Sequence, residues 1–373
     1  MINPKLFYNK LIEHSSFISG VPDSLLKELN SCILEEHPLN EHIIAPNEGV
    51  SISLGIGNYI STGKISTIYF QNSGIGNTIN PLISLADKDV YGIPMLLLIG
   101  WRGEPDTKDE PQHFKQGLIQ ESLLKSLDIP YIIIDKNSKG YFERIDDLVR
   151  MSYKEKRPVS ILFRKNTFSK YEFNNKNKIN SELESRELAI ENIIDILDNN
   201  NTVFVGTTGK ASRELYEIRI NKKLTGNLDF LTVGGMGHAS SIAAAISKNT
   251  NKRVICLDGD GALLMHMGSL VSNIECSSKR FIHVVLNNES HESVGAQPTL
   301  IKNIDLVNLA NTCGYVKAIR IKSKNDLYDF AKNKNFKNGP YFLEYLVKNK
   351  SRENLGRPKE SPKENINNLM NNV

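Results

Sequence analysis

The stretch RVICLDGDGALLMHM, residues 253–267, places an aspartate between two glycines directly after a short apolar run. The run, residues 253–257, has the β-branched side chains and the length of a buried strand. A glycine-rich turn between a strand and a helix is the ordinary reason for such a pattern. The stretch therefore predicts a strand that ends just before Asp260 and a helix that starts at Ala262.

Two familiar nucleotide-binding motifs do not account for these glycines. A GxGxxG fingerprint that begins at Gly259 would require glycine at position 264, where Leu264 stands. The glycines of GTTGKAS, residues 206–212, are too close together for the GxxxxGKS or GxxxxGKT of a P-loop. The aspartate must therefore serve another partner.

A second apolar run, residues 281–286, ends in Asn287 and Asn288. Parallel neighbours in an α/β sheet present their C-terminal ends on one edge, so we expect Asp260 and Asn288 to converge there. A carboxylate, an amide oxygen and a backbone carbonyl form an incomplete oxygen shell, which a hard cation such as Mg²⁺ completes with phosphate oxygens. The glycines let the backbone approach those phosphates, and the helix directs its N-terminus at them.

Most of the chain alternates short apolar runs with longer amphipathic stretches, which is typical of parallel α/β sheets. A polar segment rich in lysine and asparagine, residues 166–185, interrupts this alternation and is predicted to be a linker. The polar, proline-containing tail after residue 348 predicts partial disorder. The predicted fold class is α/β, with two parallel-sheet domains, residues 1–170 and 183–373, and no middle domain.

Composition excludes several classes of protein. The net charge of +4 is small, and basic residues are interspersed with acidic ones, which argues against a nucleic-acid partner. No apolar run approaches the length of a membrane span, and the N-terminal stretch lacks the pattern of a signal peptide, so we expect a soluble cytoplasmic protein without a membrane partner. Cysteines lack CxxC spacing, and we expect them to be reduced rather than zinc ligands.

The glycine-flanked aspartate followed by paired asparagines resembles the cofactor motif of the thiamine diphosphate-dependent enzymes. In that superfamily the aspartate, the second asparagine and a carbonyl two residues further on hold the metal. The resemblance therefore implies thiamine diphosphate and Mg²⁺ as cofactors, with Asp260, Asn288 and the backbone of Ser290 as metal ligands. It also implies that residues around this motif and around GTTGK bind the cofactor: Gly259, Gly261, Ala262, Thr208 and Gly209.

The same resemblance implies a glutamate that hydrogen-bonds the aminopyrimidine ring of the cofactor, so that the ring removes the thiazolium proton. Glu48 in HIIAPNEGVSISLGIG, residues 42–57, follows an apolar run and begins a helix of small and apolar residues. Desolvation would keep such a glutamate from being an ordinary surface charge. The alternative is an acid that only satisfies the helix macrodipole.

In TVGGMGHASS, residues 232–241, the resemblance makes Met236 the apolar prop of the cofactor and the Gly234 carbonyl an acceptor for its amino group. Met236 could equally be plain core filling. The family places each site between two subunits, which implies at least a homodimer. It divides the chain into a pyrimidine-binding domain, residues 1–170, and a diphosphate-binding domain, residues 183–373.

Five segments narrow the resemblance to the phosphonopyruvate decarboxylase family over nearly the whole chain: residues 20–26, 69–113, 206–215, 286–299 and 351–358. The family more often has glycine-alanine where Glu289 and Ser290 stand, and glycine at the position of Ala296. The resemblance implies decarboxylation of 3-phosphonopyruvate to phosphonoacetaldehyde and CO₂ in phosphonate biosynthesis. The thiazolium nitrogen would accept the electrons that CO₂ leaves behind.

Binding a phosphonate dianion requires cationic donors. Candidates are Arg102, Lys108, Arg352 and Arg357, each of which could instead be a solvated surface charge. Candidates for proton transfer are Asp23, His113 and His291, because thiamine decarboxylases line this pocket with an acid and histidines. His283 alternates within an apolar run and is expected in the core, whereas His238 and His266 stay undecided.

Three rival functions remain open at this point. A sulfopyruvate decarboxylase would use the same apparatus on a sulfonate analogue. A non-catalytic thiamine diphosphate-binding or regulatory subunit would not need Glu48. A metal phosphatase built on Asp260 would release phosphate without added cofactor.

Overall fold

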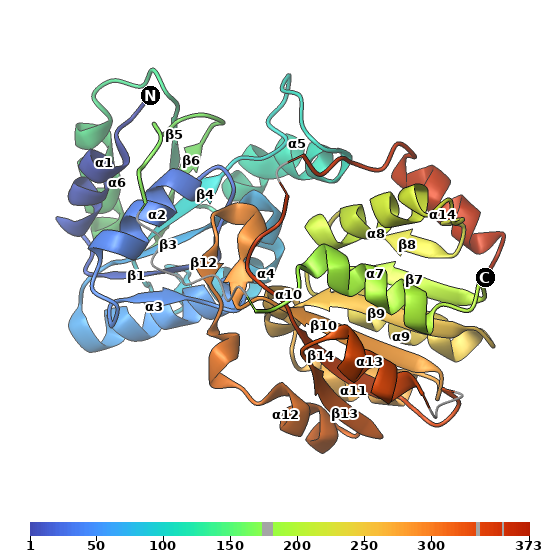
Figure 1. The fold of residues 1–373 in the computed structure, drawn as a ribbon. Helices are drawn as coiled ribbons and strands as arrows, with labels where there is room; N and C mark the ends of the chain where they lie inside the picture. Colours follow the sequence, from blue (N-terminus) through green and yellow to red (C-terminus); the bar gives the residue numbers. More distant parts are fainter. Residues whose placement is uncertain (174–181, 333–335, 353) are drawn as a thin grey trace. The chain divides into compact units, whose positions relative to one another are not determined.

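The computed structural model describes residues 1–173, 182–332, 336–352 and 354–373. The chain forms two compact units (Figure 1). The first comprises Met1–Lys176 and Val294–Gln297, and the second comprises Asn177–Ser293 and Pro298–Val373. The predicted linker, residues 166–185, includes residues 174–181, which lie outside the described residues.

The first unit contains a six-stranded parallel sheet with strand order β2-β1-β3-β4-β6-β5. Its strands are β1 (Phe17–Gly20), β2 (His42–Ile44), β3 (Ser66–Gln71), β4 (Met95–Gly100), β5 (Tyr131–Ile134) and β6 (Pro158–Phe163). Its helices are α1 (Pro4–Ile12), α2 (Lys27–Glu36), α3 (Glu48–Thr62), η1 (Asn72–Gly74), α4 (Ile75–Pro81), η2 (Leu82–Ala86), α5 (Pro111–Ser126) and α6 (Tyr141–Glu155).

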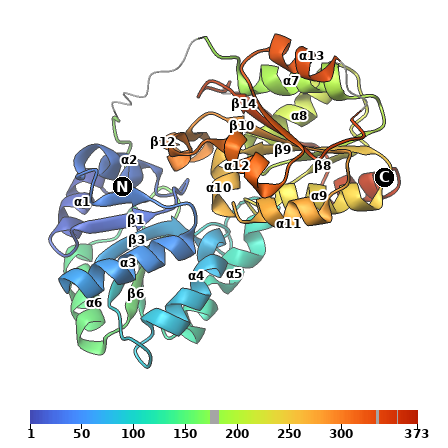
Figure 2. The ribbon, with the colours of Figure 1, turned by 90° about the horizontal axis from the view of Figure 1, so that it is seen from below.

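Successive side chains of a strand point to opposite faces, so this buried sheet has a core on each side. Tyr69 of β3 packs into the core formed with α1, α2 and α6. Its neighbours Ile68 and Phe70 pack into the core formed with α3, α4 and α5. The continuous apolar runs of the sequence are thus explained by helices on both faces of the sheet (Figure 2).

The second unit repeats this architecture with strand order β13-β14-β10-β9-β7-β8, again all parallel. Its strands are β7 (Thr202–Gly206), β8 (Asp229–Leu231), β9 (Arg253–Gly259), β10 (Phe281–Asn287), β13 (Lys317–Ile321) and β14 (Tyr341–Leu346). The short strand β11 (Ser290–His291) also belongs to it, and its partner β12 (Gln297–Pro298) has one residue in each unit. Its helices are α7 (Arg186–Leu197), α8 (Lys210–Asn221), α9 (Ala239–Asn249), α10 (Asp260–Met265), α11 (Ser269–Cys276), η3 (Glu292–Val294), η4 (Leu300–Asn303), α12 (Leu306–Cys313), α13 (Lys324–Ala331) and α14 (Pro362–Met370).

Two cores again lie on opposite faces of the sheet. Ile255 and Leu257 of β9 pack with α7, α8 and α13, whereas Val254 and Cys256 pack with α9, α11 and α12. The predicted α/β fold class with two parallel-sheet domains is therefore confirmed. None of the helices in the described part of the chain is long and apolar enough to cross a lipid bilayer.

Two local predictions were wrong. The helix expected from Ala262 begins at Asp260, with Gly259 as its N-cap. The tail after residue 348 is not disordered where the structure describes it, because α14 begins with a capping box between Ser361 and Glu364. Leu369 of this helix is 4% exposed and joins a core of the second unit.

The helix α14 is tied to β8 by one side chain. Asn365 accepts a hydrogen bond from the Leu231 N–H and donates one to the Asp229 carbonyl. In Asn365→Ala both backbone groups lose a partner, so we expect the free energy of unfolding to fall by about 1–3 kcal/mol, measured by urea titration. Asn368→Ala, at an exposed position of the same helix, should change it by less than about 0.5 kcal/mol. Equal effects of the two changes would contradict the docking role of Asn365.

Candidate functional site

The carboxyl ends of β9 and β10 lie at the same edge of the second sheet. The two strands are parallel neighbours, and Gly259 is opposite Leu286. Asp260 and Asn288 follow just beyond this edge, and the Asn288 N–H donates a hydrogen bond to the Asp260 carboxylate. The structure thus brings the backbone of Asn288 beside the Asp260 carboxylate, as expected for the two residues predicted to bind the metal.

Asp260 is a buried acid at the first position of α10, 3% exposed. Burial raises its pKa to about 6, although the Thr299 hydroxyl and nearby backbone N–H groups donate to the carboxylate and oppose the shift. The Thr299 Oγ1 lies 2.6 Å from Asp260 Oδ2. A divalent cation here would restore the ionised form, and the carboxylate, amide and carbonyl oxygens of this edge are the hard donors that Mg²⁺ prefers.

Asn288 is held in one orientation by its neighbours. Its Oδ1 accepts from the Ser290 N–H at 3.1 Å, and its Nδ2 donates to Glu292 Oε2 at 3.4 Å. Glu292 is fixed in turn by Arg186 at 2.6 Å and by Lys210 at 3.0 Å. The carboxylate of Glu292 therefore orients a candidate metal ligand, a role that the sequence analysis missed.

Two residues that depart from the family pattern adopt left-handed backbone conformations. Glu289 has φ = 57° and Ala296 has φ = 59°. The resemblance had pointed to glycine at both positions, and glycine adopts this conformation without the steric penalty of a side chain. The departures therefore fall where the backbone turns most tightly.

Gly261 sits between two candidate site residues. A Cβ added to it would lie 2.9 Å from His291 Cε1 and 3.4 Å from Met236 Cε. Met236 and His291 thus both reach the residue that follows Asp260. Burial lowers the pKa of His291 to about 4, so its imidazole is neutral near pH 7. Gly234 lies two residues before Met236 in the same loop and is half-buried.

The loop after β7 supplies an unpartnered hydroxyl at this edge. Thr207 Oγ1 is buried and has no hydrogen-bond partner among the described residues, and the methyl group of Thr207 faces Gly259. Thr208, the residue expected to bind cofactor, donates its hydroxyl to the Val233 carbonyl at 2.9 Å. Gly209 has φ = 99° and precedes α8. The GTTG motif pointed to this loop, but the sequence did not show that the hydroxyl of Thr207, rather than that of Thr208, lacks a partner among the described residues.

Ser290 Oγ is also buried without a partner in the described chain. These unpartnered polar atoms at Thr207 and Ser290, near the candidate metal-binding residues Asp260 and Asn288, fit a diphosphate and its metal.

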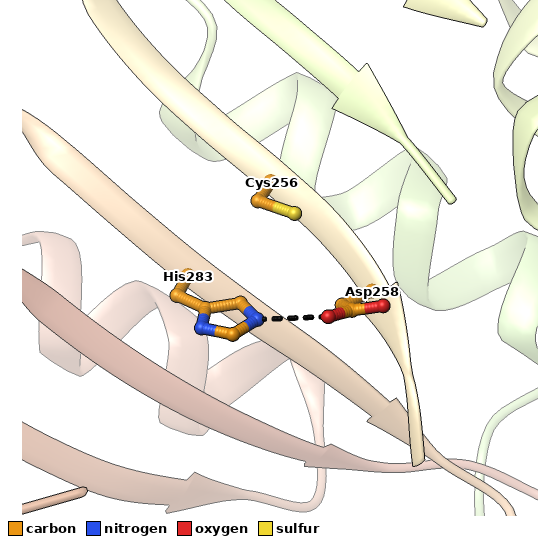
Figure 3. A group of neighbouring side chains, drawn as sticks. All are labelled: Cys256, Asp258 and His283. Atoms are coloured by element: carbon orange, nitrogen blue, oxygen red, sulfur yellow. Dashed lines mark hydrogen bonds and ion pairs between the residues drawn. The ribbon is translucent and has the colours of Figure 1, made fainter. Parts of the chain in front are cut away.

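A separate buried cluster lies on β9 and β10, just before the edge of the sheet that Asp260 and Asn288 follow, as Figure 3 shows. His283 donates or accepts at both ring nitrogens, contacting Tyr315 at 3.0 Å and Asp258 at 3.1 Å. Asp258 Oδ1 also accepts from the Gly259 N–H. Cys256 completes the group, and all of these side chains are buried. His283 is thus a core residue, and its hydrogen bond to Asp258 ties β10 to β9.

In the first unit, Glu48 begins α3 directly after β2 and is 5% exposed. Its Oε2 accepts a hydrogen bond from Asn77 Nδ2 at 2.8 Å. A Cβ added to Gly74 would lie only 2.0 Å from Glu48 Oε1, so the carboxyl group turns inward across a glycine. Burial raises the pKa of Glu48, with Asn77 opposing the shift. An acid that only satisfies the helix macrodipole could remain exposed, so the burial of Glu48 favours a further role.

Asp23 follows β1 and is 1% exposed. Its Oδ2 accepts from the Leu26 N–H, and its Oδ1 has no partner in the described part of the chain. Gly100 makes room for it, because a Cβ there would lie 1.8 Å from Asp23 Oδ2. Burial raises the pKa of Asp23 to about 6, with backbone donors and Arg102 opposing the shift.

Arg102 is committed to other residues of the first unit. It makes two hydrogen bonds to Asp109 and one to Ser24. His113, in the first turn of α5, is buried and its Nδ1 has no partner among the residues described. Burial and the Arg102 charge lower the pKa of His113.

The other candidate cations do not gather with Arg102. Lys108 is exposed and forms no ion pair within the described chain. Arg352, in the second unit, is paired with Glu187 and Glu217, and Arg357 is exposed.

The two undecided histidines, His238 and His266, stack with ring centroids 4.5 Å apart. They line a cavity together with Ser241 and Ser269.

Comparison with known proteins agrees with this geometry. Residues 205–345 match the family model of the C-terminal thiamine pyrophosphate-binding domain of thiamine pyrophosphate enzymes. The chain is 30% identical to phosphonopyruvate decarboxylase of Streptomyces viridochromogenes over 93% of this chain and 88% of that protein. It is 27% identical to phosphonopyruvate decarboxylase of Streptomyces hygroscopicus over 93% and 88%. It is also 27% identical to sulfopyruvate decarboxylase of Methanosarcina acetivorans over 83% and 81%.

The left-handed backbone at Glu289 has a measurable consequence. The Glu289 side chain is exposed, so Glu289→Gly removes steric strain without removing a buried contact. We expect the free energy of unfolding to rise by about 1 kcal/mol in denaturant titration. Glu143→Gly, within α6, should lower it by a similar amount because glycine disfavours a helix. A decrease for Glu289→Gly would contradict the strained turn.

Proposed function

The chain belongs to the phosphonopyruvate decarboxylase family, and we propose that it converts 3-phosphonopyruvate to phosphonoacetaldehyde and CO₂ with thiamine diphosphate and Mg²⁺. The observation that carries the proposal is a pair of buried acids, Glu48 and Asp260, each beside the neighbours that cofactor binding requires. Two deeply buried carboxyl groups at sheet edges are costly unless a ligand uses them.

In this proposal the second unit is the diphosphate-binding domain, residues 183–373. Asp260, Asn288 and the Ser290 carbonyl would hold Mg²⁺, and the unpartnered hydroxyl of Thr207 would donate to the diphosphate. Gly259, Gly261 and Gly209 would let the backbone approach the phosphates. Thr208 and Ala262, which adjoin these glycines, are also proposed to bind the cofactor. Met236 and the Gly234 carbonyl support the heterocycle.

The first unit is the pyrimidine-binding domain, residues 1–170. Burial raises the pKa of Glu48, which favours the protonated carboxyl group that would hydrogen-bond a ring nitrogen of the cofactor, and Asn77 fixes the direction of that group. The bound cofactor supplies an electron sink for the pair of electrons that CO₂ leaves behind.

The protein then has to supply a proton to the decarboxylated carbon. Asp23, with its unpartnered Oδ1 and raised pKa, is the proposed donor. His113 and His291 are neutral and serve as hydrogen-bonding partners that hold substrate or relay the proton. Arg102 holds the loop to Asp109 beside Asp23 and contributes positive charge rather than a free fork for the phosphonate.

Two copies of the chain complete each site in this proposal. Glu48 of one copy would face the Mg²⁺ site of a second copy, which gives at least a homodimer. The proposed location is the cytoplasm.

A sulfonate substrate is the second candidate, because the chain is 27% identical to a sulfopyruvate decarboxylase over most of its length. Incubating the purified holoenzyme with phosphonopyruvate or sulfopyruvate and measuring the aldehyde formed distinguishes the two. Preference for sulfopyruvate would replace our substrate assignment. Activity that persists without thiamine diphosphate would refute the mechanism as a whole.

Glu48→Gln tests the role of the buried glutamate. The amide cannot share a proton in the same way, so we expect kcat to fall at least about 100-fold while the Kd for thiamine diphosphate, measured calorimetrically, changes little. Glu35→Gln, at an exposed position of the same unit, should leave both quantities unchanged. Turnover at the wild-type rate in Glu48→Gln would identify a non-catalytic binder or another mechanism.

The pKa of Asp23 predicts a pH dependence. If the neutral acid donates the proton, the active fraction of free enzyme falls as pH rises through about 6, and kcat/KM should fall with it. In Asp23→Asn this fall of kcat/KM with rising pH should disappear, and the rate of decarboxylation should be lower at every pH. Rates of CO₂ release between about pH 5 and about pH 8 test this. A fall of kcat/KM that persists in Asp23→Asn would assign it to another group.

A further inference from the structure

An unpaired cation lies beside an unpartnered buried amide in the first unit. Lys27 is the first residue of α2, and its exposed ammonium pairs with no carboxylate of the described residues. Gln297 is 1% exposed, and neither its Oε1 nor its Nε2 has a hydrogen-bond partner among the residues that the structure describes. Buried amides are almost always hydrogen-bonded, so Gln297 has capacity reserved for a ligand.

Gly295 places these two side chains next to each other. A Cβ added to Gly295 would lie 2.8 Å from Gln297 Nε2 and 3.0 Å from Lys27 Cγ. The segment Val294–Gln297 belongs to the first unit, so the contact lies within one compact body. Gly295 also has φ = 122°, a conformation that favours glycine. The absence of a side chain at Gly295 thus lets the amide of Gln297 and the stem of Lys27 both approach the same point of the backbone.

The proposed proton donor lies in the segment that leads into α2. Asp23 accepts from the Leu26 N–H, immediately before Lys27 begins α2. Its Oδ1 is unpartnered, like both polar atoms of Gln297. The start of α2 therefore carries an acid, with an ammonium and an amide nearby, all with unfilled hydrogen-bonding capacity.

Competing cations are less suited to an anionic ligand. Arg102 and Arg352 are already paired with carboxylates. Lys108 is unpaired, but none of the described contacts places an unpartnered buried side chain beside it.

We propose that Lys27 and Gln297 bind the phosphonate group of the substrate. The inference rests on the proposed function and deepens it. The ammonium supplies charge to the dianion, and Gln297 Nε2 donates a directed hydrogen bond to one of its oxygens. The ketone and carboxylate, at the other end of this short substrate, are then held on the side of Asp23. The proposed phosphonate-binding residue Lys27 and the proposed proton donor Asp23 thus lie close together in the sequence, at the start of α2.

Lys27→Met tests the site in the holoenzyme, with Lys108→Met as the matched exposed control. We expect Lys27→Met to raise the KM for phosphonopyruvate at least about tenfold with kcat changed much less, because the contact is made in ground and transition states alike. Phosphonoacetate, which lacks the ketone, should inhibit the wild type and Lys108→Met but inhibit Lys27→Met at least about tenfold more weakly.

Gln297→Leu gives a second, independent reading, with a smaller rise in KM and in the inhibition constant of phosphonoacetate. Unchanged KM and inhibition constant in Lys27→Met, or the loss appearing in Lys108→Met instead, would overturn the proposal. These outcomes leave the proposed function standing if the wild type decarboxylates phosphonopyruvate. A wild type without that activity would instead refute the proposed function, and direct calorimetric binding of phosphonoacetate to the wild type and Lys27→Met would still decide the anion site.

Discussion

The candidate site depends on the parallel register of β9 and β10. With Gly259 opposite Leu286, the residues that follow the two strands emerge at one edge, where the Asn288 N–H binds the Asp260 carboxylate. A slip by one residue would turn one strand's side chains to the opposite face. The buried hydrogen bond between His283 and Asp258 resists such a slip, because it links the strands just before the edge. The core therefore sets the geometry of the oxygen ligands.

Sequence reasoning could predict this part of the site because its rules are local. An apolar run followed by Gly259 and Asp260, and a second run followed by Asn288, need only the rule that parallel strands end at one edge. The same alternation of runs predicted both sheets. Glu48 was predicted from the family resemblance together with its position between an apolar run and a helix, and its inward orientation depends on Gly74, a residue of another segment.

Residues that act through tertiary contacts were out of reach. Asn77 contacts Glu48 and Lys27 approaches Gly295 only in the folded chain, and no sequence motif marks Glu292 as the partner of Asn288. The tail was mispredicted for a related reason: its composition is polar, but one capping box and one buried leucine suffice to anchor a short helix. Charge alone also did not predict that Arg102 pairs with Asp109, or that Arg352 pairs with Glu187 and Glu217, which are distant in the chain.

Each unit encloses its own pair of cores, one on either face of its sheet, and no core cluster draws residues from both. Interrupting the polypeptide between the two sheets would thus leave every hydrophobic cluster whole. Two shorter polypeptides, one for each sheet, would therefore retain the hydrophobic interiors that they need.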